Sequence, residues 1–252
     1  MKLRVAFSKK GPVKFIGHLD TQRFFQRALK RAGWDVAYSQ GFSPHPILSF
    51  AAPLGVGLES DSEIFDIEMV TAGSREDLID SLNAASCEGF TIIDVRVMDE
   101  GTGNAMASVA AASYTVDLAG AEAAAREAAG ECGQDGDTAP MADEFPDEWL
   151  DQAVAELNAK TELIISKKTK KSELQVDIKP GIYELKSTRD GLYMLVDASS
   201  GGNVRPEQVT GALYELAGRK APDVRLKVTR NQIYGRTPEG GLKPLIEFGH
   251  AF

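Results

Sequence analysis

Two histidines stand in stretches whose residue types could do chemistry. His18 lies in KFIGHLDTQR, and His45 lies between two prolines in GFSPHP. We expect His18 where a strand turns into a helix, and a helix N-terminus presents free N–H groups and a positive dipole end to an anion. As a general base, His18 would need a partner such as His45, whose proximity the sequence does not show. The spacing therefore predicts anion binding at His18, with catalysis by His18 and His45 as an alternative and structural histidines as the simplest interpretation.

The loop around His45 is expected to be stiff. Pro44 and Pro46 fix their own φ angles and push the preceding residues towards extended geometry. Gly41 permits a positive φ or a close approach of the backbone. We predict that Gly41, Phe42 and His45 form a recognition edge beside a basic helix. The alternative is an irregular sheet edge that prolines protect against pairing.

Three cationic elements favour a polyanionic partner. Over residues 18–32 the helical period places apolar residues on one side and four cations on the other, namely Arg23, Arg27, Lys30 and Arg31. Two further cationic groups are expected in a loop between strands and on the outward face of the last strand: Lys167, Lys168, Lys170 and Lys171, then Arg225 and Lys227. Together these elements indicate RNA or another phosphate-rich partner, although each alone is more often a solvated face.

The net charge of -9 is distributed unevenly along the 252 residues. Residues 1–50 carry net +7, residues 51–150 net -19 and residues 151–252 net +3. The acidic middle contains residues 119–148, which are rich in Ala, Gly, Asp and Glu. We predict a disordered insertion there, with a helix at its Ala-rich start as an alternative. Its simplest role is none, and a sharper hypothesis is an intramolecular mimic of a polyanion.

The expected elements predict an α+β fold of two similar units. In the first half we expect strands at 2–8, 38–50, 64–70 and 90–98, with helices at 18–32 and from Ser74, which Asp77 would help to cap. The second half offers strands at 113–118, 162–166, 181–187, 192–198 and 224–230, with helices around 149–157 and from Pro206. This order predicts tandem ferredoxin-like (split βαβ) units with antiparallel sheets, over residues 1–104 and 105–252.

Several classes of protein are not favoured by the composition. Cys87 and Cys132 are isolated from each other and from the histidines, so no disulfide framework, zinc spacing or iron–sulfur motif is predicted. Asp66 and Glu68 alternate onto one face, expected to be exposed, with no His or Cys nearby, so we predict no metal and no cofactor. The absence of a signal pattern and of a membrane-length apolar run predicts a cytoplasmic protein without a membrane partner.

Residues 13–60 carry a family resemblance. The segments FIGHLD, SQGFSPHP and LSFAAPLGVGLES resemble the radical-SAM-linked family, a bacterial domain of unknown function, and the resemblance extends more weakly to about residue 236. It implies a domain fused to, or encoded beside, a radical S-adenosylmethionine (radical SAM) protein, which would bind the iron–sulfur cluster. In topology alone, the chain also resembles CRISPR repeat-processing endoribonucleases, an analogy of fold and not of function.

We therefore predict an accessory RNA-binding or substrate-presenting protein that acts with a radical SAM enzyme in RNA modification. Whether the chain is an enzyme stays open, and the sequence favours no catalytic activity of its own. One alternative is a metal-independent endoribonuclease that uses His18, with or without His45. A protein-binding adaptor that uses the apolar AAPLGVG edge is the other. The RNA, the partner's reaction and the oligomeric state are not predicted.

Overall fold

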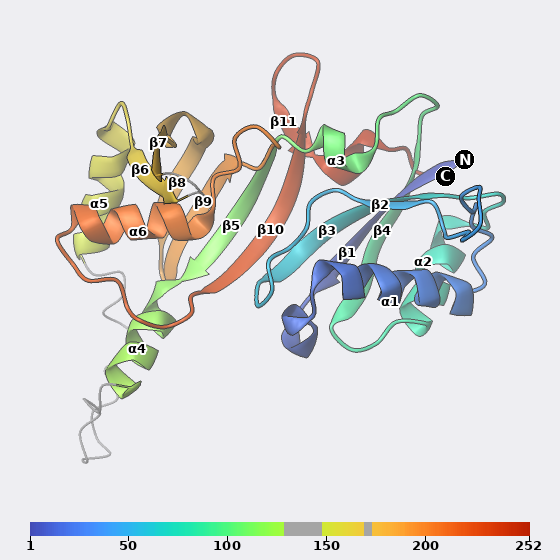
Figure 1. Cartoon of the computed structure of the whole chain (residues 1–252), viewed down its shortest axis with the longest axis horizontal. Helices are drawn as coiled ribbons and strands as arrows, with labels where there is room; N and C mark the ends of the chain where they lie inside the picture. The colour runs from blue at the N-terminus through green and yellow to red at the C-terminus, as the bar shows by residue number, and fades with distance from the viewer. Residues whose placement is uncertain (129–147, 169–172) are drawn as a thin grey trace. The chain divides into compact units, whose positions relative to one another are not determined.

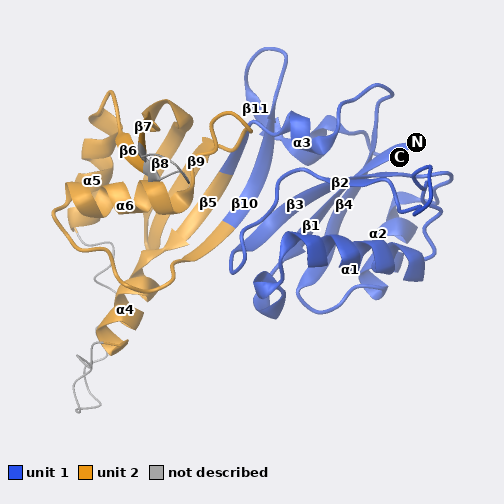
Figure 2. Ribbon diagram, viewed as in Figure 1, with its two compact units in different colours: residues 1–112, 230–252 blue, residues 113–229 orange. Residues whose placement is uncertain are grey.

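The computed structural model describes residues 1–128, 148–168 and 173–252 (Figure 1). It confirms the predicted α+β class, with mostly antiparallel strands. The chain divides into two compact units, residues 1–112 with 230–252 and residues 113–229 (Figure 2). The predicted boundary after residue 104 places residues 105–112 and 230–252 in the second domain, whereas both segments group with the first unit.

Unit 1 is a sheet covered by helices. Its elements are β1 (Lys2–Lys9), the 3-10 helix η1 (Gly11–Phe15), α1 (His18–Arg31), β2 (Leu48–Phe50), β3 (Glu59–Glu68), α2 (Arg75–Ala84), β4 (Phe90–Met98), α3 (Ala105–Ser108), most of β10 (Lys227–Arg236), β11 (Leu242–Pro244) and the 3-10 helix η3 (Leu245–Phe248). The strand order is β4-β1-β3-β10, with β2 paired to β3 and β11 to β10. Strand β1 is antiparallel to both β3 and β4.

Helices α1 and α2 form where the sequence predicts them. Helix α1 buries Phe25, Ala28 and Leu29, and the chain turns after it at Gly33, whose φ is 73°. The ring of Phe25 packs edge-on against Phe7, with the ring centroids 4.6 Å apart. The predicted cap of α2 is confirmed, because the Ser74 side chain accepts a hydrogen bond from the Asp77 backbone N–H.

Strands β1 and β3 are buried on both faces, so the predicted exposed face of β3 is wrong at Asp66. The Asp66 side chain is buried, and its carboxylate accepts two hydrogen bonds from Arg4, at 2.7 and 3.0 Å. Arg4 also donates to the Leu245 carbonyl at 3.0 Å, so the C-terminal segment covers this face of the sheet. Alternation within one strand does not reveal a cover supplied by residues far along the chain.

Unit 2 combines a second group of strands with three α-helices, of which α5 and α6 pack together. Its elements are most of β5 (Ala111–Asp117), α4 (Leu118–Ala128), α5 (Glu148–Ala159), β6 (Ile164–Lys168), β7 (Glu173–Asp177), the 3-10 helix η2 (Lys179–Gly181), β8 (Ile182–Thr188), β9 (Gly191–Asp197) and α6 (Pro206–Leu216). The strand order is β5-β9-β8, while β6 and β7 form a separate antiparallel hairpin. Pro206 begins α6 as predicted.

The acidic segment 119–148 begins as a helix. Residues up to Ala128 belong to α4, which buries Leu118 and Ala121, so the prediction of disorder is wrong there and the helical alternative is confirmed. The Glu122 carboxylate accepts a hydrogen bond from the Tyr214 hydroxyl at 3.0 Å, and burial together with this carboxylate raises the pKa of Tyr214. Residues 129–147 lie outside the described part of the chain.

Gly89 is expected to be irreplaceable at the turn before β4. Its φ is 96°, and an added Cβ would lie 2.5 Å from the Lys10 carbonyl oxygen and 2.7 Å from Val13 Cγ2. Gly33 also has a positive φ, yet no described neighbouring atom lies within 4 Å of its Cβ position. We expect Gly89→Ala to lower the free energy of unfolding by about 1–3 kcal/mol more than Gly33→Ala. Urea denaturation of the two variants checks this, and equal losses would contradict the close approach.

Candidate functional site: the surface of helix α1

Helix α1 turns a row of cations to solvent. Arg23, Arg27 and Lys30 are exposed, and the opposite side of the helix is buried in the core of unit 1. Arg23 Nη1 lies 3.3 Å from Asp20 Oδ1, and this contact between exposed side chains contributes little to stability. Arg31 differs from the other three, because its Nη2 donates to the Ala85 carbonyl at 2.7 Å, at the end of α2. The predicted stripe of four is therefore a row of three outward cations beside one that contacts α2.

His18 is the first residue of α1 and is half-buried. Its ring packs edge-on against Phe50, with ring centroids 5.2 Å apart. With Lys9, Thr21 and Glu63 it lines a cavity of about 10 Å³, which is about the size needed for one water molecule. His18 thus lies at the helix N-terminus as predicted, beside a cavity of mixed polar and apolar lining that is too small for a nucleotide.

A buried ionic cluster of Lys9, Glu63 and Arg230 adjoins His18. Arg230 Nε donates to Glu63 Oε1 at 2.8 Å, and Arg230 Nη2 makes a second bond to Glu63 Oε2. Lys9 Nζ donates to the Ile16 carbonyl at 2.8 Å, just before α1. Burial lowers the pKa of Lys9, and the Glu63 charge opposes this shift. The cluster therefore links β1, β3 and β10 to the entry of α1.

None of these three residues was predicted as a site residue, although the sequence holds a signal for them. Lys9 is in phase with Phe7 on β1, Glu63 with Phe65 on β3, and Arg230 with Val228 on β10. A charged residue in phase with buried apolar residues on a strand points inward, where it requires a partner. The sequence does not identify that partner, because Glu63 and Arg230 are 167 residues apart.

The GFSPHP loop is closed by its own hydrogen bonds. Tyr38 and Pro46 form an isolated β-bridge, and the Ser39 N–H donates to the His45 carbonyl at 2.9 Å. His45 Nδ1 lies 3.0 Å from Ser39 Oγ. At the tip, Gly41 has a φ of 122° and the Phe42 side chain is fully exposed. His45 therefore has its contacts within the loop, and among the described residues no contact joins it to His18.

The other two cationic elements belong to unit 2. The backbone of Lys167 and Lys168 forms the end of β6, but their side chains, like Lys170 and Lys171, lie outside what the structure describes. Arg225 and Lys227 are both exposed, but β10 begins at Lys227, so the predicted strand start at 224 is wrong and Arg225 precedes the strand. The structure thus assigns the α1 cations to unit 1 and these cations to unit 2.

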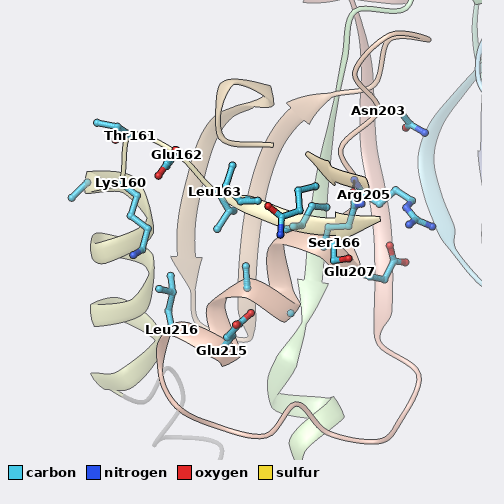
Figure 3. Close-up of a pocket in the computed structure, with 17 residues that line it drawn as sticks. Lys160, Thr161, Glu162, Leu163, Ser166, Asn203, Arg205, Glu207, Glu215 and Leu216 are labelled. Atoms are coloured by element: carbon cyan, nitrogen blue, oxygen red, sulfur yellow. Dashed lines mark hydrogen bonds between the residues drawn. The ribbon is translucent and has the colours of Figure 1, made fainter. Parts of the chain in front are cut away.

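Unit 2 also contains an open groove between α6, the end of α5 and strand β6 (Figure 3). Its volume is about 1530 Å³. Lys160 and Arg205 line it together with Glu162, Glu207 and Glu215. Because the carboxylates outnumber the cations, the groove does not favour a polyanion. The predicted site residues within the described ranges do not line it.

Two general searches of the described residues bear on other functions. Within residues 1–128, 148–168 and 173–252, no group of three or more His, Cys, Asp or Glu side chains could hold a metal ion. Over the same ranges, none of the helices combines the length and apolar character needed to cross a membrane.

Comparison with known proteins identifies a family for this chain. No curated protein matches it. A family described as "Uncharacterized protein conserved in bacteria (DUF2344)" matches residues 2–206, a span that contains α1, the GFSPHP loop and the buried Lys9 and Glu63. Because this match covers most of the 252 residues, the chain belongs to the DUF2344 family.

Proposed function

We propose that this protein is an RNA-binding accessory protein, which recognises or presents RNA to a radical SAM enzyme. The observation that carries the RNA part is the outward row of Arg23, Arg27 and Lys30 on α1. Among the residues that the structure describes, the one ion pair of this row is the exposed contact of Arg23 with Asp20. The phosphates of RNA would supply the missing counter-charge along the whole row.

The geometry of a helix suits this role. Arg23 and Arg27 are four residues apart, so they repel each other on the helix surface and lie about 6 Å apart along the axis. Lys30 extends the row to about 10 Å. The burial of Phe25, Ala28 and Leu29 anchors α1 against this repulsion. A row of cations on a rigid element can follow a phosphate backbone without reading its sequence.

The partner and the finer fold rest on other observations. The radical SAM enzyme is proposed from the resemblance of FIGHLD, SQGFSPHP and LSFAAPLGVGLES to the radical-SAM-linked family. The strand order β4-β1-β3, with β2 on β3, supports a ferredoxin-like arrangement in unit 1, and β5-β9-β8 supports one in unit 2. Co-purification of a radical SAM protein with the tagged full chain would test the partner.

RNA binding is expected to be strongly dependent on salt. Three phosphate contacts give a fall of log K against log salt concentration with a slope of about -2 for a single strand. Fluorescence anisotropy of a labelled single-stranded RNA, between about 50 and about 200 mM salt, measures this slope. The control is an oligonucleotide of the same sequence with a neutral methylphosphonate backbone, which should bind only weakly. Absent binding, or binding that salt does not change, would refute the proposed function.

A further inference from the structure

Two large apolar side chains are exposed at the entry of α1. Phe15 is 59% exposed and Leu19 is 64% exposed. Leu19 is one helical turn before Arg23, so the outward row of α1 begins with an apolar side chain and continues with cations. Phe15 ends η1, three residues before α1. Sites for single-stranded nucleic acid combine aromatic rings with cations, and here an exposed ring lies just before the helix that carries the cations.

The backbone on both sides of Phe15 is held in place by hydrogen bonds, while its ring stays largely exposed. The Lys14 carbonyl accepts a hydrogen bond from the Gly57 N–H at 2.7 Å, and the Ile16 carbonyl accepts one from the buried Lys9 Nζ at 2.8 Å. Lys14 Nζ lies 5.5 Å from the centre of the Phe15 ring and 3.0 Å from Glu59 Oε1. The buried ammonium of Lys9 therefore helps to fix the segment that presents the ring. A ring positioned before binding loses little entropy when a ligand stacks on it.

We infer that Phe15 is a stacking platform for an unpaired base, so that the α1 surface takes single-stranded rather than double-stranded RNA. This inference rests on the proposed function and specifies its substrate class. In a duplex the bases are stacked on one another and are closed to a protein ring, whereas unpaired bases are open to it. The cations of α1 then hold the phosphates of the strand that continues from the stacked base.

The test compares the binding of single-stranded and duplex RNA by Phe15 variants. The probe is a labelled oligonucleotide of about 12 nucleotides, alone or annealed to its complement. We expect Phe15→Ala to weaken single-strand binding about five-fold or more, since loss of stacking on one base has at least this effect. Phe15→Trp should retain it, and duplex binding should be weak for each protein. The control is Phe252→Ala, which removes another exposed aromatic ring of unit 1 and should change nothing.

Failure of this inference is distinguishable from failure of the proposed function. If Phe15→Ala binds the single strand as the unchanged protein does, while charge reversal on α1 weakens binding, the stacking platform is refuted and RNA binding stands. Equal binding of single strand and duplex refutes it as well. If Phe15→Ala instead loses only a co-purifying protein, the ring belongs to a protein contact and the inference is overturned. Absence of RNA binding by the unchanged chain refutes the proposed function itself.

Discussion

Replacing Glu63 by glutamine is expected to lower the free energy of unfolding by about 3–5 kcal/mol, because it leaves a buried guanidinium without its counter-charge. Glu63 and Arg230 are each 3% exposed, and both oxygens of the carboxylate accept hydrogen bonds from the guanidinium. Lys9, itself 2% exposed, adds a second cation: burial lowers the pKa of its ammonium, and the Glu63 charge opposes that shift. Glutamine keeps the volume but removes the charge that compensates both cations. Urea denaturation followed by circular dichroism measures the change.

Two further variants separate charge from packing. Lys9→Met, Glu63→Leu and Arg230→Met combined remove every charge of this cluster, so we expect stability within about 1 kcal/mol of the unchanged protein or above it. Lys10→Met removes a neighbouring ion pair between Lys10 and Asp61, in which the two side chains are 55% and 44% exposed. Because this pair is solvated, its loss should lower the free energy of unfolding by less than about 1 kcal/mol. If Glu63→Gln lowers the free energy of unfolding no more than Lys10→Met does, the prediction that burial makes this cluster important for stability is wrong.

The elements predicted well are those whose signal is local. The helix over 18–32 follows from its apolar period, and the start of α2 follows from a cap between Ser74 and Asp77. Strand β3 shows the opposite case, because it begins at Glu59 and not at 64 as predicted. The polar residues Glu59–Glu63 resemble a loop, yet Ser60 Oγ donates to the Arg230 carbonyl at 2.9 Å. The backbone of this polar segment pairs with β1, where Ser60 lies opposite Lys9, and β10 lies on its other side. No local pattern reveals these partners.

In the candidate site, too, the features predicted from the sequence are the local ones. The outward position of Arg23, Arg27 and Lys30 is a property of one amphipathic helix, and the structure places all three in solvent as expected. The contact of Arg31 with the Ala85 carbonyl depends on how α1 packs beside α2, which the sequence does not show. The sequence does not predict Phe15 as a site residue. Its exposure results from a 3-10 turn, and the carbonyl groups on both sides of it accept hydrogen bonds from Gly57 and Lys9, contacts that no local pattern shows.

Reversing the charges of Arg23, Arg27 and Lys30 to glutamate is expected to weaken the binding of single-stranded RNA on the order of 50-fold near physiological salt. The loss of three phosphate contacts also makes the slope of log K against log salt concentration less negative by about 2. The helix itself should persist, because its buried side is unchanged and glutamate is as good a helix former as arginine or lysine. Fluorescence anisotropy gives the affinity, and circular dichroism confirms the fold.

A matched control distinguishes this surface from net charge. Lys186→Glu, Arg189→Glu and Lys220→Glu combined change the total charge equally, at exposed positions of unit 2. If RNA were attracted only by overall charge, both triple variants would lose affinity alike. Because short-range phosphate contacts are screened far less than distant charges, we expect the unit 2 variant to stay within about three-fold of the unchanged protein. Equal losses of RNA affinity in the two variants would contradict α1 as the binding surface. A loss of affinity confined to the α1 variant would establish α1 as that surface.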